Sequence, residues 1–262
     1  MGFSAAQGGG IGFDSAQGGA LGFAPAQGPG GAAPPPPPPD SLLTGLSVWY
    51  SMDEVSGVRV DANGDSNLDL TDINTVGSES GEVNLAASFL TANAELLRGT
   101  WDTTAYSWET SLDYTMAFWA KVPDVTQNEG ACGRWLSGSN IEFWLYAPLG
   151  SPLSVPVIYW GQGAGNKNVA APDAMVNDTW HLIMVEIDIT ADTLGISLDN
   201  GTPETVSFGG GGINGNKGLY FYIGGGNSSA ALDGGIDEFA IWKRLLTSDE
   251  KTRLAAGMGY PG

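Results

Sequence analysis

The chain has 262 residues, and 29 Asp and Glu against 10 Lys and Arg give it a formal net charge of −19. A field of that sign repels phosphate backbones and anionic lipid headgroups, which excludes nucleic acid and membrane surfaces as partners. The single cysteine, Cys132, excludes an internal disulfide, and we expect a buried, inert thiol. The sequence shows neither a basic and apolar leader nor an apolar stretch of about 18 residues, so we expect no secretion signal and no membrane span.

Residues 1–33 form a Gly-rich arm with a ten-residue period, in which three units begin with Gly-Phe and the first two close with an aliphatic residue. Glycine at this density maximises the entropy lost on ordering, so we expect the arm alone to be disordered. A flexible spacer is one interpretation, but a spacer does not need aromatic residues at one interval. We therefore predict that the arm anchors the protein in an assembly. The anchor candidates are Phe3, Ile11, Phe13, Leu21 and Phe23.

Six consecutive prolines follow the arm at 34–39 and predict an extended polyproline II rod. Together with Asp40 they form a linker, 34–40, which leaves residues 41–262 for one domain. That domain holds all nine Trp, all eight Tyr and six of the nine Phe, so it can bury a core without covalent cross-links. A ligand for proline-reading domains is a less favoured interpretation of the prolines, because basic flanking residues are absent.

From Leu46 onward, short runs rich in β-branched and aromatic residues alternate with Gly, Asn, Asp and Pro clusters, which is typical of an all-β sandwich or barrel. The pair Asn200-Gly201 predicts a tight turn at a loop tip. A short helix is predicted at 248–257, with Thr247 or Ser248 as its N-cap. The predicted strands are 46–52, 114–122, 141–146, 181–189, 194–198, 219–223 and 236–242.

Segment 49–57, with the sequence WYSMDEVSG, resembles the opening strand of laminin G-like domains in the concanavalin A-like lectin and glucanase superfamily. Segments 178–181 (DTWH) and 194–201 (LGISLDNG) look like the central hairpin of that family. Segment 235–247 (GIDEFAIWKRLLT) is similar to its final strand and the turn into a terminal helix. The resemblance implies a jelly-roll sandwich of two antiparallel sheets in which the first and last strands are neighbours. The family is common in adhesins, carbohydrate-binding modules and bacteriophage particles, so its fold restricts function only partly.

The residues do not support an enzyme. Hydrolytic members of the resembled superfamily carry a strand motif of the form Glu-x-Asp-x-x-Glu or a close variant. Here Glu186 and Asp188 are followed by Thr190 and Ala191, so the third carboxylate is missing. His181, the single histidine, has no Gly-x-Ser-x-Gly elbow to complete a serine triad. We therefore predict no catalytic residue, with Glu186 and Asp188 facing outward from a strand.

Two kinds of binding site are predicted. The resemblance implies a calcium ion where the first and last strands meet, and the matching positions are Asp53 and Asp237, with a hydrogen-bonded pair of aspartates as the alternative. Tryptophans in loop-like stretches can stack on the C–H groups of a sugar ring, with burial in the core as the alternative. The candidates for glycan binding are Trp101, Trp108, Trp135 and Trp160.

These features favour a non-enzymatic structural or accessory protein of a virus particle, specifically a bacteriophage. The arm would bind a capsid or tail protein, and the sandwich would be displayed outward on the virion. The alternative is a carbohydrate-binding module or adhesin, extracellular or on a bacterial surface, with the arm as a flexible tether. Cell-surface polysaccharide is a partner in either function. A glycoside hydrolase is the third and least favoured function. The three repeats leave open whether the protein forms a homo-oligomer.

Overall fold

The computed structural model describes residues 40–262 except 102–105, 107, 110, 136–140, 151, 163–164, 210–219, 226–230, 260 and 262. The arm, the proline run 34–39 and the anchor candidates Phe3, Ile11, Phe13, Leu21 and Phe23 lie outside the described residues. Within the described residues, no helix is long and apolar enough to cross a membrane. Cys132 is buried as expected, and this burial raises the pKa of its thiol above its usual range.

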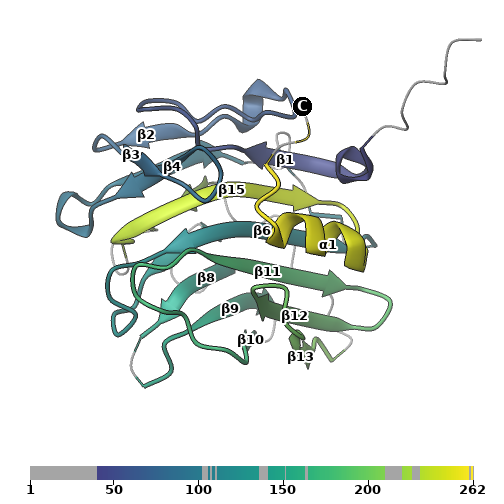
Figure 1. Ribbon diagram of the computed structural model, residues 1–262. Helices are drawn as coiled ribbons and strands as arrows, with labels where there is room; N and C mark the ends of the chain where they lie inside the picture. The colour runs from purple at the N-terminus through teal and green to yellow at the C-terminus, as the bar shows by residue number, and fades with distance from the viewer. Residues whose placement is uncertain are drawn as a thin grey trace, which may run out of the picture. The chain divides into compact units, whose positions relative to one another are not determined.

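Two antiparallel sheets form the domain (Figure 1). The strands of the first sheet are β1 (Leu46–Tyr50), β3 (Gly77–Ser80), β4 (Leu85–Phe89), β6 (Tyr114–Lys121), β11 (His181–Asp188), β12 (Thr193–Leu198), β13 (Glu204–Ser207) and β15 (Gly234–Trp242). The strands of the second sheet are β2 (Thr71–Ile73), β5 (Leu96–Thr100), β7 (Gly130–Trp135), β8 (Ile141–Leu149), β9 (Val155–Gln162), β10 (Gly165–Ala170) and β14 (Tyr220–Ile223). The helical elements are η1 (Ser41–Leu43), η2 (Ser66–Leu68), η3 (Thr91–Asn93) and α1 (Ser248–Ala255).

The first sheet has the order β13-β12-β11-β6-β15-β4-β3, with β1 also paired to β15, and the second has the order β10-β9-β8-β7-β14-β5-β2. The predicted all-β jelly-roll sandwich with a short C-terminal helix is confirmed. Each of the seven predicted strands is present with small shifts at its ends. Several strands were not named from the sequence. Segments such as β3 (GSES) and β10 (GNKNVA) lack the β-branched and aromatic residues that mark a strand, whereas β9 (VPVIYWGQ) has them and was missed.

Strand β15 connects the parts of the first sheet. One of its edges pairs with β6, and the other pairs first with β4 and then with β1, so that β4 and β1 lie end to end along it. The predicted contact between the first and last strands is therefore confirmed. Where the partner changes, the pairing with β6 is interrupted by an irregularity between Asp237 and Ala240, and Glu238 has a φ of +49°. Such a bulge redirects side chains at the edge of a sheet.

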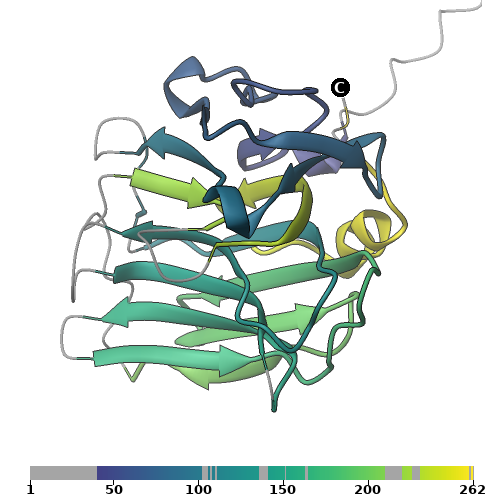
Figure 2. The same cartoon turned by 90° about the vertical axis from the view of Figure 1, so that its left-hand side faces the viewer.

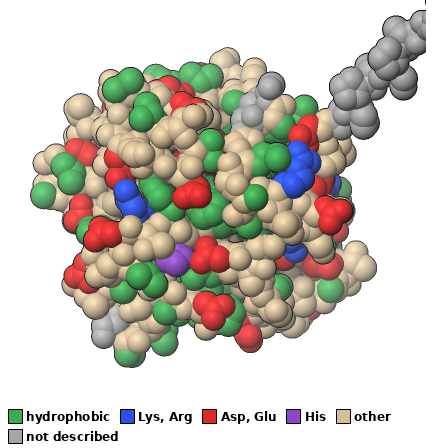
Figure 3. Space-filling model, viewed as in Figure 1, with side chains coloured by type: hydrophobic (Ala, Val, Ile, Leu, Met, Phe, Trp, Pro, Cys, Tyr) green, Lys and Arg blue, Asp and Glu red, His purple; other side chains and the backbone are tan. Residues whose placement is uncertain are grey.

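The main core lies between the two sheets, and a second apolar cluster lies on the outer face of the first sheet. Helix α1 covers this outer face, lying across β6 and β15 in Figure 1 and outside the sheets in Figure 2. A capping box between Thr247 and Glu250 starts the helix, as predicted. The indole N–H of Trp242 donates to the backbone oxygen of Leu42 (2.7 Å), so η1 packs on the same face. Acidic side chains are spread over this covered side instead of forming one patch (Figure 3).

The hairpin between β12 and β13 turns one residue earlier than its Asn-Gly pair suggests. Asp199 and Asn200 have φ values of +51° and +59°, and the N–H of Gly201 donates to the oxygen of Leu198 (2.8 Å). These are the features of a type I′ turn with Asp199 and Asn200 at its centre. The Asp199 carboxylate explains the position, because its Oδ1 accepts from the N–H of Leu182 (2.9 Å) on the neighbouring strand.

Glu129 links the segment before β7 to the start of β15. It is 5 % exposed, and its Oε2 accepts a hydrogen bond from the N–H of Asp233 (2.7 Å). Burial raises the pKa of Glu129 from 4.5 to about 7, and the charges of Asp233 and Asp124 add to the rise. The folded protein therefore binds this proton more tightly than the unfolded chain does, and stability falls as the pH rises from about 4.5 to about 7.

We expect Glu129→Gln to remove this loss, because the amide oxygen still accepts from Asp233 and carries no charge. In urea titrations at about pH 8 the variant should be more stable than the wild type by roughly 1 to 3 kcal/mol, and at about pH 4.5 the two should be equal. The exposed Glu204→Gln serves as the control. A difference between wild type and Glu129→Gln that is the same at both pH values would contradict the assignment.

Candidate functional site

Three of the four tryptophans predicted to bind sugars are in the core. Trp101, Trp108 and Trp160 are each at most 2 % exposed, so their ring faces cannot reach a ligand, and the prediction is wrong for these three residues. The side chain of Trp135 lies outside the described part of the chain.

Ring contacts explain why these loop tryptophans turn inward. Trp101 stacks on Phe221 with ring centroids 3.9 Å apart, and Trp108 meets Trp160 edge to face at 5.4 Å. Burial of an indole removes a large apolar area from water, and ring pairs of this kind add to the free energy gained. These tryptophans are therefore more stable between the sheets than at the surface. A loop-like sequence does not report this preference.

The outer face of the second sheet presents tyrosines instead. In β14, Phe221 is in the core while its neighbours Tyr220 and Tyr222 are half-buried, as the alternation of side chains along a strand requires. Tyr146 of β8 and Tyr159 of β9 are also half-buried and lie between core residues. We call these four residues, Tyr146, Tyr159, Tyr220 and Tyr222, the tyrosine face.

A row of paired residues crosses this face from β5 to β10. The Cα partners in the row are Arg98, Tyr222, Gly133, Trp144, Tyr159 and Asn168. Five steps between strands of about 4.8 Å each give the row a length of about 24 Å. A Cβ at Gly133 would overlap the Trp144 ring, so the glycine makes room for the indole to lie against the sheet, where it is only 4 % exposed. Trp144 then supports Tyr146, whose ring is 5.9 Å away, and Tyr146 in turn contacts Tyr159 at 5.8 Å.

An arginine stands at one end of the row. Arg98 is exposed on β5, and its guanidinium carbon lies 5.0 Å from the ring centroid of Tyr220. Burial raises the pKa of the Tyr222 phenol, and the nearby charge of Arg98 opposes that rise. The tyrosine face thus combines ring faces, hydroxyl groups and one positive charge.

The sequence contained a signal for this surface that the prediction of binding residues did not use. The predicted strands 141–146 and 219–223 include Tyr146, Tyr220 and Tyr222, and the run YFYI places a tyrosine at every second position. Alternation marks Tyr220 and Tyr222 as members of one face. Their alignment with Tyr159 depends on strand pairing and is visible only in the structure.

The two predicted metal ligands meet at the junction of β1 and β4 along β15. Oδ1 of Asp53 accepts from the N–H of Leu85 (3.0 Å), and Oδ2 of Asp237 accepts from the N–H of Val83 (2.8 Å). Both carboxylates therefore hold the turn between β3 and β4. The topology brings together two residues that are far apart in the sequence.

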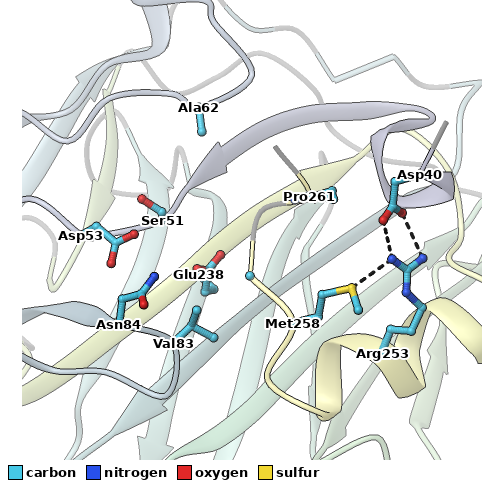
Figure 4. Close-up of a pocket in the computed structure, with 11 residues that line it drawn as sticks. Asp40, Ser51, Asp53, Ala62, Val83, Asn84, Glu238, Arg253, Met258 and Pro261 are labelled. Atoms are coloured by element: carbon cyan, nitrogen blue, oxygen red, sulfur yellow. Dashed lines mark hydrogen bonds and ion pairs between the residues drawn. The ribbon is translucent and has the colours of Figure 1, made fainter. Parts of the chain in front are cut away.

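A cleft of about 580 Å³, here called the edge cleft, opens at this junction (Figure 4). In Figure 4 the side chains of Asp53, Asn84 and Glu238 lie around one opening. On the other side of the cleft, Nη1 of Arg253 bonds Oδ1 of Asp40 (3.0 Å). The lining includes Asp40, Ser51, Asp53, Val83, Asn84, Glu238, Arg253 and Met258.

One carboxylate oxygen at the junction has the environment expected of a calcium ligand. Oδ1 of Asp237 is buried and has no hydrogen-bond partner among the described residues. Burial raises the pKa of Asp237 to about 7, and the charge of Asp53 adds to this rise, so a cation here would relieve a buried and repelled charge. The described residues contain no group of three or more His, Cys, Asp or Glu that could hold a metal, so backbone carbonyls and water would complete the coordination.

The other ionisable residues considered from the sequence have local structural contacts. Glu186 of β11 pairs with Lys251 of α1 (2.6 Å), and Oδ1 of Asp188 accepts from the N–H of Ala191 (2.7 Å). Nδ1 of His181 lies 2.7 Å from Oδ2 of Asp199, while its Nε2 accepts a backbone N–H. Both ring nitrogens of His181 are therefore engaged within the fold.

A family model described as the concanavalin A-like lectin/glucanases superfamily matches residues 100–250, more than half of the chain. No curated protein sequence matches the chain significantly.

Several solved structures share the fold. The binding domain of Paraclostridial Mosquitocidal Protein 1 is 14 % identical with a TM-score of 0.62, over 82 % of this chain and 52 % of that domain. Botulinum neurotoxin type C, which depends on interaction with two ganglioside molecules to enter cells, is 12 % identical with a TM-score of 0.63, over 84 % and 53 %. Domain 4 of AbnA, an extracellular arabinanase of Geobacillus stearothermophilus, was solved in complex with arabinotriose. It is 18 % identical with a TM-score of 0.57, over 80 % and 98 %. The chain thus spans about half the length of the two toxin structures, and at these identities the likeness shows the fold alone.

We propose that Asp53 and Asp237 bind a calcium ion, and we expect calcium to raise the melting temperature of the EDTA-treated protein. At roughly 100 times its Kd, calcium stabilises a folded state by about 2.7 kcal/mol. Asp53→Asn should abolish the gain without changing the melting temperature in EDTA, because the amide oxygen can still accept from Leu85. The exposed Asp173→Asn is the control, and magnesium is the comparison ion. A wild-type melting temperature that calcium leaves unchanged would contradict the proposal.

Proposed function

We propose that this chain, which belongs to the concanavalin A-like lectin/glucanases superfamily, binds carbohydrate on the tyrosine face of its sandwich. The observation that carries the proposal is the row of aligned aromatic and polar residues across the outer face of the second sheet. The arabinotriose complex of the AbnA domain and the ganglioside interaction of neurotoxin type C support the substrate class.

The chemistry of the tyrosine face suits a sugar chain. A pyranose ring presents C–H groups to an aromatic ring, and a half-buried tyrosine loses little side-chain freedom when it stacks. The phenol groups and the Asn168 amide can exchange hydrogen bonds with sugar hydroxyls. The outer face of the first sheet is less suited, because α1 covers it.

Binding without hydrolysis follows from the same row. Cleavage of a glycosidic bond requires an acid and a second carboxylate on either side of that bond. The row from Arg98 to Asn168 contains arginine, tyrosine, glycine, tryptophan and asparagine, and no carboxylate. The proposal is thus a non-enzymatic domain that attaches to polysaccharide outside a cell.

We expect Tyr159→Ala and Tyr222→Ala each to weaken binding by about 3- to 10-fold, the value of one lost aromatic contact. Calorimetric titration with arabino-oligosaccharides and a ganglioside headgroup oligosaccharide measures the change. Tyr159→Phe keeps the ring and should retain most of the affinity, and Leu153→Ala changes an exposed apolar residue outside the tyrosine face. Unchanged affinity in both alanine variants would show that carbohydrate does not bind on the tyrosine face.

The decamer repeat favours a second function, as an accessory protein of a virus particle. Phe3, Phe13 and Phe23 recur at one interval, as expected for aromatic groups that fit equivalent pockets of an assembly. A Gly-rich segment can approach another chain closely and bond through its main chain. A lectin-like domain carried on a capsid or tail would then contact host polysaccharide.

Comparison of the full chain with a variant lacking residues 1–39 tests the particle function. We expect the full chain to co-sediment with phage particles and the truncated chain to remain in the supernatant with an unchanged melting temperature. Replacement of Phe3, Phe13 and Phe23 by Ser in the full chain should also abolish sedimentation. Equal sedimentation of all forms would contradict anchoring by the arm and leave it the function of a flexible tether.

A further inference from the structure

Most of the Lys and Arg residues that the structure describes form ion pairs within the fold. The chain has ten Lys and Arg residues, and seven of them form ion pairs with carboxylates. Lys217 lies outside the described residues. Among the described carboxylates, none pairs with Arg98 or Lys167. The seven paired cations are Arg59, Lys121, Arg134, Lys243, Arg244, Lys251 and Arg253.

The two remaining cations differ in position. Arg98 is the Cα partner of Tyr222, so it belongs to the row on the tyrosine face. Lys167 is the Cα partner of Trp160, whose side chain is in the core, so it belongs to the opposite set of residues on β10. One unpaired positive charge thus lies beside the stacking surface, and the other does not.

Arg98 is also held in place. Its guanidinium lies 5.0 Å from the Tyr220 ring centroid, within the range of a cation–π contact. Tyr220 and Tyr222 contact each other at 6.2 Å, so the charge is adjacent to two aromatic rings. A charge that is oriented before binding loses less entropy when a ligand arrives.

We infer that Arg98 makes the proposed carbohydrate site selective for sugars that carry a carboxylate, such as uronic acids. The inference rests on the proposed function, because it assigns a substrate class to the same face. A sugar ring stacked on Tyr222 would place its carboxylate within reach of the guanidinium. The guanidinium fork matches a carboxylate with two parallel hydrogen bonds, and the row offers no competing carboxylate.

The net charge of −19 does not prevent such binding. At physiological ionic strength, charges separated by more than about 8 Å are largely screened, so the local arginine dominates the contact. The same net charge opposes unspecific attraction of anionic polymers. Selectivity should therefore depend on Arg98 itself.

The test compares polygalacturonate with its fully methyl-esterified form, because the two differ in the charge of the carboxyl group. We expect the wild type to bind the acid about tenfold more tightly than the ester. Arg98→Met should bind both equally, and Arg98→Lys should keep part of the preference. Lys167→Met, which removes the second cation that pairs with none of the described carboxylates, should behave as the wild type. Polysialic acid tests a second source of a sugar carboxylate.

The possible failures are distinct. Equal binding of acid and ester by the wild type overturns the inference and leaves carbohydrate binding intact. An equal gain for dextran sulfate over dextran identifies a general anion site and overturns the carboxylate assignment. If neither these polymers nor the neutral oligosaccharides bind, the proposed function fails together with the inference.

Discussion

The pairing of β15 with three strands is the constraint on which the rest of the domain depends. Because β4 and β1 share one edge of β15, a junction must exist where one partner ends and the other begins. The bulge at Glu238 and the buried Asp237 lie at that junction, and Glu238 accepts from the indole N–H of Trp49 on β1. The same edge therefore closes the sheet and forms the edge cleft, with the buried carboxylate of Asp237 beside it.

The outer faces of the two sheets differ: one is covered by helical elements, and the other is partly exposed. Helix α1 and η1 cover the outer face of the first sheet with a second apolar cluster, in which Trp49 and Trp242 are fully buried. The outer face of the second sheet keeps its tyrosines half-exposed, and Trp144 fills the space above Gly133. Trp144 itself is only 4 % exposed and serves to position the sheet's outer rings, whereas the half-buried tyrosines remain available to a ligand.

The positively charged side chains are also divided between the interior contacts of the fold and the outer face of the second sheet. The excess of acidic residues favours solubility and leaves few cations for binding. Most cations are used within the fold, as in the pair between Arg134 and Glu142, which is fully buried (3.1 Å). Arg98 has no such role among the described contacts with carboxylates, and its position beside Tyr220 and Tyr222 gives that charge a use in binding.

The sequence alone determined the all-β class, the main strands, the capped helix at Ser248–Ala255 and the neighbourhood of the first and last strands. It also selected Asp53 and Asp237, which the structure places at one junction, while calcium binding by this pair stays a prediction. The tertiary structure decided which aromatic residues face solvent. Trp101, Trp108 and Trp160 are core residues in spite of loop-like surroundings, because burial of an indole between the sheets outweighs any local pattern. The row from Arg98 to Asn168 includes β5, β14 and β7, which are not consecutive in the chain, and its register arises only when β14 inserts between β5 and β7.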